Sequence, residues 1–224
     1  MDVNTFRMLA SVSDKTGLTD LVTGLKKIFG NGLMVLSTGG TAKKLKEESL
    51  PVMDVASFTG SPEVMGGRVK TLHPKIFGGI LARRNDPADM DEMTNVLKSA
   101  EISLVVVNLY PFAKAADNRN TPFDELIEQI DIGGPSLLRA AAKNFRDVLV
   151  VADPTDYPRL LEELRCEGGP TLQFRLELMR KAFRHTANYD ARIAIEMEKH
   201  TAIWEGKVSR VHLDQISRTL NDRS

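Results

Sequence analysis

The 224-residue sequence contains one cysteine, Cys166, and one tryptophan, and aromatic residues make up only 6% of it. A single cysteine excludes an intrachain disulfide, which favours a reducing compartment. No apolar run approaches the roughly 20 residues that a membrane-spanning helix needs. The first residues also lack the basic segment and apolar run of a secretory signal. We therefore expect a cytoplasmic protein that does not contact a membrane.

An excess of charge is absent as well, because 30 basic residues balance 30 acidic ones and the pI is about 6.9. A neutral chain has no overall field that would attract nucleic acid or an anionic surface, so we expect no nucleic-acid partner. A locally basic site for a small anion is compatible with this balance. The length suits one well-packed domain with an appendage, and 42% hydrophobic residues is ordinary for a globular protein.

Short apolar runs alternate with helical patterns through the first two thirds of the chain. Alternation of this kind is typical of a parallel sheet with helices on both faces. A separate helix start is indicated by Thr121 as the cap and Pro122 in the first turn. The expected strands cover 7–12, 33–36, 51–55, 102–109 and 148–152, and the expected helices include 16–29, 41–48 and 136–144.

The last part of the chain reads as helical. The pattern over 171–200 predicts one broken helix or two helices packed on the sheet, and Cys166–Pro170 predicts a turn and a weak subdomain boundary. We therefore expect an α/β domain over 1–200 with a helical C-terminal portion, followed by a charged tail over 201–224.

Two polar turns follow neighbouring strands, at the edge where an open parallel sheet binds its ligands. Ser13–Thr16, which includes Lys15, follows the first strand, and Thr38–Thr41 follows the second. Both lead into helices, where free backbone N–H groups can hold a phosphate. Neither is a Walker loop or a dinucleotide fingerprint. Either turn alone would serve merely as a helix cap, but two together favour a phosphate-bearing ligand.

The segment Gly66–Pro74 concentrates positive charge. In an extended chain Arg68 and Lys70 project to the same side, where they repel each other unless an anion or a carboxylate lies between them. A solvated basic loop would explain the charges. It would not explain the glycine pair before them or the His73–Pro74 pair after them.

Two further segments point to the same edge of the sheet. The strand over 102–109 ends at Asn108, with Tyr110 just beyond, and either would also serve as an ordinary strand-end residue. Asp131 precedes a helix that carries Arg139 and Lys143 on one face. Taken alone, Asp131 would be a helix-start carboxylate and Lys143 a solvated cation near the helix end.

Taken together and in order, these segments closely resemble the IMP cyclohydrolase domain of the bifunctional AICAR transformylase/IMP cyclohydrolases. The resemblance rests on SVSDKTGL, STGGTAK, GGRVKTLHP, NLYPF and DIGGPSLLRAAAKN, extends to AFRHTANYDARIA, and covers roughly residues 8–197. It implies a methylglyoxal-synthase-like fold, with a mainly parallel sheet flanked by helices. It also implies closure of 5-formamidoimidazole-4-carboxamide ribotide (FAICAR) to IMP with loss of water, the last step of de novo purine biosynthesis.

The resemblance also implies the site residues, and the chemistry of ring closure suggests a role for each catalytic one. Catalysis would rest on Lys70, Tyr110, Asp131 and Lys143. Asp131 would accept a proton or hydrogen bond from the carboxamide, and Lys70 would polarise the formyl oxygen and assist water loss. Lys143 and Tyr110 would orient that centre. The phosphate and the rest of the substrate would be bound by Ser11, Ser13, Lys15, Thr16, Thr38, Gly39, Gly40, Thr41, Arg68, Thr71, Asn108, Ile132 and Gly133.

No cofactor or metal is expected, because the substrate already carries both reacting groups. The folate-dependent transformylase domain of the family has no counterpart here, so we expect no transformylase activity. The sequence leaves open a free-standing enzyme or part of a longer protein, a homodimer, and a separate transformylase partner. The alternatives are methylglyoxal synthase and a nucleotide-sensing regulatory module. RVKTLHP and DIGG…RAAAKN argue against the former, and the presence of all four catalytic residues argues against the latter.

Overall fold

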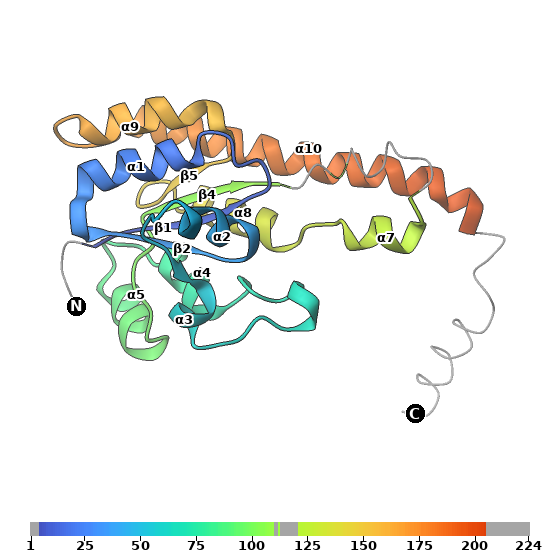
Figure 1. Ribbon diagram of the computed structural model, residues 1–224, viewed down its shortest axis with the longest axis horizontal. Helices are drawn as coiled ribbons and strands as arrows, with labels where there is room; N and C mark the ends of the chain where they lie inside the picture. The colour runs from blue at the N-terminus through green and yellow to red at the C-terminus, as the bar shows by residue number, and fades with distance from the viewer. Residues whose placement is uncertain (1–4, 110–111, 113–120, 205–224) are drawn as a thin grey trace. The chain divides into compact units, whose positions relative to one another are not determined.

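A computed structural model describes residues 5–109, 112 and 121–204 of the chain (Figure 1). The chain divides into two compact units. Unit 1 comprises Met1–Pro111 and Asp131–Ala187, and unit 2 comprises Phe112–Ile130 and Asn188–Ser224. The expected subdomain boundary at 166–170 is therefore wrong, because that turn lies inside unit 1. The expected division into 1–200 and 201–224 stays a prediction.

A parallel sheet of five strands forms the centre of unit 1. Its order is β3-β2-β1-β4-β5, so the first strand lies in the middle. The predicted strands are confirmed, but the third is shorter than expected because Val55 already begins a helix. The strands are β1 (Phe6–Val12), β2 (Leu33–Ser37), β3 (Met53–Asp54), β4 (Leu104–Asn108) and β5 (Leu149–Val151).

Helices connect the strands and cover both faces of the sheet. Right-handed crossovers in this strand order place α1 and α2 on one face and α4 and α8 on the other. α9 packs beside α1, and α4 packs beside α8 (Figure 1). The helices of unit 1 are α1 (Leu18–Phe29), α2 (Gly39–Glu47), α3 (Val55–Thr59), α4 (Pro74–Leu81), α5 (Pro87–Asp91), α8 (Gly133–Lys143) and α9 (Tyr157–Arg165). Single turns occur at Gly30–Gly32, Met65–Gly67, Glu92–Val96 and Pro154–Asp156.

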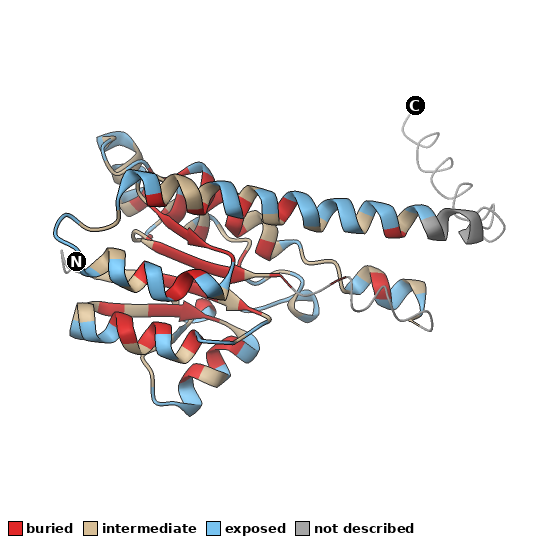
Figure 2. Cartoon of the chain, turned by 90° about the horizontal axis from the view of Figure 1, so that it is seen from above, coloured by how far each residue is buried: buried red, intermediate tan, exposed pale blue. Residues whose placement is uncertain are grey.

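The core consists of the strands, which are buried along most of their length, and of the inner faces of these helices (Figure 2). In β4, Leu104, Val105, Val106 and Val107 each expose 1% or less of their surface. A strand that lies between two helical layers must be apolar on both sides, which is why this run lacks the alternation of a half-exposed strand. Burial of such side chains is the main force that holds the layers together.

Three helix predictions need correction. Pro122, rather than Thr121, occupies the N-cap position of α7 (Phe123–Glu128), in unit 2. α8 starts at Gly133, three residues earlier than expected, because the glycine pair already belongs to its first turn. The C-terminal part is one continuous helix, α10 (Leu172–Trp204), rather than a broken helix or two. Its sequence contains no glycine or proline that would end or kink it.

Unit 2 has its own apolar contacts. Leu126 of α7 is almost fully buried, with 1% of its surface exposed. The rings of Phe112 and Tyr189 meet edge to face with their centroids 6.5 Å apart. Among the described residues of the whole chain, no helix combines the length and apolar character that crossing a bilayer requires.

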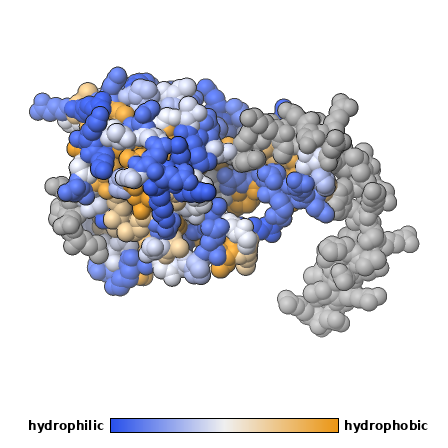
Figure 3. Space-filling model, in the orientation of Figure 1, coloured by the Kyte–Doolittle hydropathy of each residue, from blue (hydrophilic) through white to orange (hydrophobic). Residues whose placement is uncertain are grey.

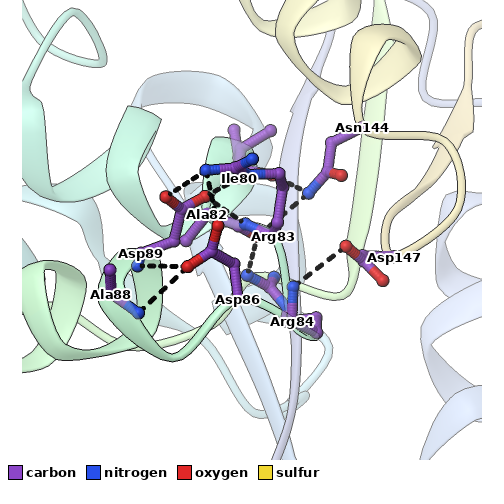
Figure 4. Close-up of polar contacts among 9 residues, drawn as sticks. All are labelled: Ile80, Ala82, Arg83, Arg84, Asp86, Ala88, Asp89, Asn144 and Asp147. Atoms are coloured by element: carbon purple, nitrogen blue, oxygen red, sulfur yellow. Dashed lines mark hydrogen bonds and ion pairs between the residues drawn. The ribbon is translucent and has the colours of Figure 1, made fainter.

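A polar network joins the helix ends at the edge where β4 and β5 begin (Figure 4). The Asn144 side chain, just after α8, donates to the carbonyl oxygens of Ile80 and Ala82 at 2.8 and 3.1 Å. The Arg84 backbone N–H donates to the Asp147 carboxylate at 3.1 Å. These bonds fix the end of α8 beside the end of α4, at the opposite edge from the carboxyl ends of the strands.

Hydrophilic residues cover much of the face shown in Figure 3, with hydrophobic ones between them. The large apolar side chains that remain exposed include Met65, Val96 and Ile132, which expose 73%, 70% and 59% of their surface. Met65 and Ile132 flank segments that were predicted to bind the substrate, and both segments belong to unit 1.

Gly79 in α4 packs directly on neighbouring backbone, and this contact gives a test of the core. A Cβ added at Gly79 would lie 2.5 Å from the carbonyl oxygen of Ala100. Gly79→Ala should therefore lower the free energy of unfolding by about 1–3 kcal/mol, measured by urea denaturation followed by circular dichroism. Gly78→Ala is the matched control, because there the obstacle is the end of the Leu97 side chain, which can rotate. Equal losses in the two variants would contradict this packing argument.

His185 in α10 gives a pH test. Its Nε2 is buried and has no hydrogen-bond partner in the described part of the chain, and burial lowers its pKa below the ordinary value of about 6.5. The unfolded chain therefore takes up a proton as the pH falls through about 6.5, while the folded chain resists it. Stability should be full above that pH and should decrease below it. His185→Gln should lose less unfolding free energy than wild type between about pH 7.5 and pH 5.5. An identical pH slope in the two proteins would refute this assignment.

Candidate active site

Asn108, the last residue of β4, holds the turn that follows β1. Its Oδ1 accepts from the backbone N–H groups of Ser13 and Asp14 at 2.7 and 2.9 Å, and its Nδ2 donates to the carbonyl oxygen of Asp14 at 2.8 Å. The pairing of β1 with β4 sets Val12 opposite Asn108, which brings the amide to the turn. Asn108 thus supports the turn from within the protein, and its predicted contact with a substrate stays a prediction.

The first turn differs from the expected array of free N–H groups. The N–H groups of Ser13 and Asp14 are bound to Asn108, and the N–H of Thr16 donates to the Asp14 carboxylate at 2.9 Å. Backbone groups that are already bonded within the turn are not open to a ligand. This turn can therefore offer mainly side chains, above all those of Ser13 and Lys15.

Thr41 joins the second turn to the first. Its buried hydroxyl accepts from the Val12 N–H at 3.2 Å and donates to the Val12 carbonyl oxygen at 3.0 Å. The alternative that each turn merely caps its helix does not hold for Ser13 or Thr41, because neither residue is at a cap position. The cap of α1 is Gly17, with φ of 68°, and the cap of α2 is Thr38.

The start of α2 combines a helix N-terminus with a cation. Thr38 makes no side-chain cap hydrogen bond, so the first N–H groups of α2 remain available. The Lys15 amine lies 3.8 Å from the position that a Cβ of Gly40 would take, and it donates to the Ser13 carbonyl oxygen at 3.3 Å. A helix N-terminus beside an ammonium group attracts anions, which supports the predicted phosphate site here.

Residues 61–73 form a closed loop rather than the expected extended segment. Val64 and Val69 pair in antiparallel fashion, and Gly66 and Gly67 turn the chain between them with φ of 62° and 91°. Glycine takes such angles without strain, which explains the pair. Arg68 has helical angles, with φ of −63° and ψ of −29°, so the argument that Arg68 and Lys70 project to one side of a strand does not apply.

His73 closes the base of this loop. Its Nδ1 accepts from the Lys75 N–H at 3.1 Å and so caps α4, which begins at Pro74. Its Nε2 lies 3.1 Å from the hydroxyl oxygen of Ser61. Because Nδ1 accepts, the proton of the neutral ring is on Nε2 and is donated to Ser61. The His73–Pro74 pair therefore has a structural role, because it starts α4 and holds the base of the loop through Ser61.

Thr71 and Asp131 meet at the start of α8. The Asp131 Oδ1 accepts from the Gly134 N–H at 2.9 Å, which confirms Asp131 as a helix-start carboxylate. A Cβ placed on Gly133 would lie 2.9 Å from the Thr71 hydroxyl oxygen and 4.0 Å from Asp131 Oδ1. A hydroxyl and a carboxylate from distant segments therefore converge on Gly133, and Lys70 immediately precedes Thr71.

The start of α8 also contacts the end of β4. A Cβ on Gly134 would lie 2.6 Å from Cδ2 of Leu109, the residue after Asn108. The same strand end therefore touches the first polar turn through Asn108 and α8 through Leu109. The predicted site residues in the first polar turn and those at the start of α8 therefore lie along one edge of the sheet.

Lys143 does not lie at this edge. It is exposed in the last turn of α8, about 15 Å along the helix axis from Gly133. Asn144, the next residue, is bound to the end of α4 at the opposite edge (Figure 4). A helix between two parallel strands returns the chain to the edge where the strands begin. The structure therefore does not bring Lys143 together with Lys70 or Asp131 within the chain.

The other predicted residues take varied positions. Ser11 lies in β1 and is half-buried, Thr16 and Gly39 are exposed, and Ile132 caps α8. Tyr110 lies outside the described residues. Within the described ranges, no three His, Cys, Asp or Glu residues are grouped so that they could hold a metal ion.

Sequence reasoning missed two residues beside the turns. Glu63 accepts from the Thr38 hydroxyl at 3.3 Å, and the ring of Tyr157 lies 3.4 Å from the position of a Cβ on Gly17. Burial raises the pKa of the Tyr157 hydroxyl well above its usual range, so this ring supports the turn as an uncharged group. The repulsion between Arg68 and Lys70 predicted a carboxylate nearby, and this argument could have identified Glu63, which lies in the same loop.

Comparison with protein families decides the classification. A family model described as the MGS-like domain matches residues 17–136. The chain belongs to the MGS-like domain family. A second model, described as the AICARFT/IMPCHase bienzyme, matches residues 141–220 of this MGS-like chain. The predicted methylglyoxal-synthase-like fold and the resemblance to the cyclohydrolase domain are confirmed.

Curated relatives of this MGS-like chain include the bifunctional purine biosynthesis protein PurH of two organisms. The chain is 51% identical over 187 residues to PurH of Trichormus variabilis and 50% identical over 194 residues to PurH of Thermosynechococcus vestitus. The matches cover 83% and 87% of this chain but only 36% and 37% of those proteins. The chain thus spans little more than a third of their length.

A solved structure described as the crystal structure of ForH has a similar fold. It superposes with a TM-score of 0.73 at 36% sequence identity, and the match covers 86% of this chain and 97% of that one.

The support that Asn108 gives to the first turn predicts an effect on ligand binding. Asn108→Ala should weaken the binding of the predicted phosphate-bearing ligand, with a purine nucleoside monophosphate as the probe, about tenfold, because the turn must then be ordered when the ligand binds. Titration calorimetry measures the affinity, and thermal melting checks the fold. Asn95→Ala is the control, since Asn95 donates to Asp91 on the exposed surface. Unchanged affinity in Asn108→Ala would show that the turn holds its shape without the amide.

Proposed function

We propose that this chain is an IMP cyclohydrolase, which closes FAICAR to IMP and releases water. The observation that carries the proposal is that two groups of residues lie along one edge of the sheet. One is the start of α2 with Lys15, which suits a phosphate, and the other is Thr71, Asp131 and Gly133 at the start of α8. The similarity to PurH and the match to the AICARFT/IMPCHase model support the same activity. The proposal concerns ring closure, and formyl transfer is not assigned to these residues.

The 5′-phosphate of the ribotide would bind at the start of α2. The N–H groups of Gly39, Gly40 and Thr41 point out of the first turn of that helix, and the Lys15 amine lies beside Gly40. Together they offer hydrogen bonds and positive potential to a dianion. Ser13 would add a hydroxyl from the first turn. Bound in this way, the phosphate directs the imidazole along the edge toward α8.

Ring closure then needs three events at the base. First, the carboxamide nitrogen attacks the formyl carbon, so a C–N bond forms. Second, that nitrogen loses a proton and the former formyl oxygen takes one up. Third, the C–O bond breaks and the oxygen leaves as water after a second protonation, while the formamide nitrogen gives up its proton and the C=N bond of the closed ring forms. Both reacting groups belong to one molecule, so holding them in attack geometry supplies a large part of the acceleration. The rest comes from a proton acceptor at the nitrogen and positive charge at the oxygen.

We assign these tasks to groups at the start of α8. Asp131 accepts the carboxamide proton, while its Oδ1 bond to the Gly134 N–H fixes the carboxylate in place. Lys70, next to Thr71, places an ammonium group at the formyl oxygen and supplies a proton to the departing water. The N-terminus of α8 at Gly133 adds positive potential at the same point. The predicted part of Tyr110 stays a prediction, and Lys143 is given no role because it lies at the far end of α8.

Replacement of Lys70 tests this assignment directly. Lys70→Ala should lower the rate of IMP formation from FAICAR by about a hundredfold or more, because a positioned proton donor is lost. The absorbance change on ring closure measures the rate. IMP should still bind with nearly wild-type affinity, since the phosphate site is intact. Lys27→Ala, an exposed lysine at the end of α1, is the control for loss of positive charge.

The same assay separates the competing functions. Near-wild-type turnover by Lys70→Ala would remove Lys70 from the mechanism. If the wild-type chain binds IMP but converts no FAICAR, the enzyme assignment fails in favour of a regulatory nucleotide-sensing module. Production of methylglyoxal from dihydroxyacetone phosphate, with no turnover of FAICAR, would support the methylglyoxal synthase alternative instead.

A further inference from the structure

Glu63 connects the second polar turn with the loop that carries Arg68 and Lys70. Its Oε2 accepts from the Thr38 hydroxyl, which lies 3.3 Å away. Its Oε1 lies 2.6 Å from the position that a Cβ of Gly67 would occupy. One carboxylate therefore contacts Thr38, at the start of α2, and Gly67, at the tip of the loop. Neither residue is close to the other in sequence.

The loop is built so that the carboxylate fits. Gly67 has φ of 91°, an angle that favours glycine, and the absence of a side chain leaves the space in which Glu63 lies. Two other contacts hold the loop, the pairing of Val64 with Val69 and the bond between Ser61 and His73. Both are internal to the loop. Among the contacts described here, the Thr38–Glu63 bond is the one that joins it to the start of α2.

Thr38 has one hydroxyl proton, and in this structure it is donated to Glu63. A hydroxyl can donate to a single acceptor at a time in a strong bond. The phosphate site at α2 has other donors, namely the N–H groups of its first turn and the Lys15 amine. The Thr38 hydroxyl is therefore free to serve the loop while the backbone and Lys15 serve the anion.

We propose that Glu63 is a positioning residue for Lys70: held by the Thr38 hydroxyl and packed on Gly67, it fixes the 64–69 turn against the start of α2. This inference rests on the proposed function, because it assigns Lys70 to the ring closure. Glu63 is exposed, so its contact with Thr38 adds little to overall stability. Its effect is on geometry, since a small displacement of a reacting group lowers turnover sharply.

Kinetics of four variants test the proposal. Glu63→Ala should lower kcat for ring closure about tenfold while the affinity for IMP changes less than about twofold, because Lys70 is displaced and the phosphate donors are not. Glu63→Gln should keep most of the activity, since its amide oxygen still accepts from Thr38. Thr38→Val should match Glu63→Ala, and the double variant should lose no more than either single one.

Opposite results would overturn it. Additive losses in the double variant would mean that Thr38 and Glu63 act separately, as they would if the Thr38 hydroxyl bound the phosphate. A Glu63→Gln variant as slow as Glu63→Ala would mean that the charge and not the hydrogen bond matters. Glu92→Ala, which removes an exposed carboxylate from the segment Glu92–Val96, is the control for net charge.

Limited proteolysis gives a readout that does not depend on turnover. Trypsin cleaves after Arg68 and Lys70, which are both exposed, and mass spectrometry identifies these cuts. Cleavage there should be faster in Glu63→Ala and Thr38→Val than in wild type, Glu63→Gln and Glu92→Ala. Unchanged cleavage in the first two variants would refute the positioning role. If wild type shows no turnover but the cleavage pattern holds, the proposed function fails and the tether between loop and α2 stands.

Discussion

The pairing of β1 with β4 is the constraint on which the candidate site depends. It places Val12 opposite Asn108, although the two residues are far apart in sequence, and so brings an amide to the turn after β1. A shift of that pairing by one residue would direct Asn108 to the other face of the sheet and leave Ser13 and Asp14 without their acceptor. Leu109, the next residue, contacts Gly134. Both groups of site residues are thus set by one strand register.

The chain has no net charge, yet its carboxyl edge is suited to an anion. Positive potential there comes from local sources, the Lys15 amine and the N-termini of α2 and α8, rather than from an excess of basic residues. Such fields fall off within a helical turn. They suit the small phosphate ester that we propose as the ligand and would not attract a polyanion, which agrees with the balanced composition.

The strands and the location of the two turns could be predicted because they depend on local pattern. Buried runs such as Leu104–Val107 are apolar on both sides, and parallel strands share one edge for their carboxyl ends. The continuity of α10 was predicted wrongly, although its sequence contains neither glycine nor proline that would break the helix. The partners of the N–H groups in the first turn could not be predicted, because they depend on Asn108, which is distant in sequence.

The placement of Lys143 and of the 61–73 loop illustrates the same limit. A resemblance of motifs gives the order of residues along the chain but not their positions in space. Gly133 and Lys143 belong to one motif, yet they lie at opposite ends of α8. The ten-position spacing of Gly133 and Lys143 already gives the distance between them along a helix, so the separation of Lys143 from Asp131 could have been predicted. The turn at Gly66 and Gly67 was less accessible, because a basic segment gives no sign of a left-handed backbone except the glycines themselves.

Thr41 has a consequence for the shape of the sheet edge. The main-chain pairing of β1 with β2 ends at Ala10 and Ser37, and beyond it the N–H and carbonyl of Val12 are both satisfied by the Thr41 hydroxyl. One side chain therefore takes the place of a strand residue. β2 can therefore end early while the peptide groups of its neighbour stay hydrogen-bonded, so the strand pairing at this edge does not extend past Ser37.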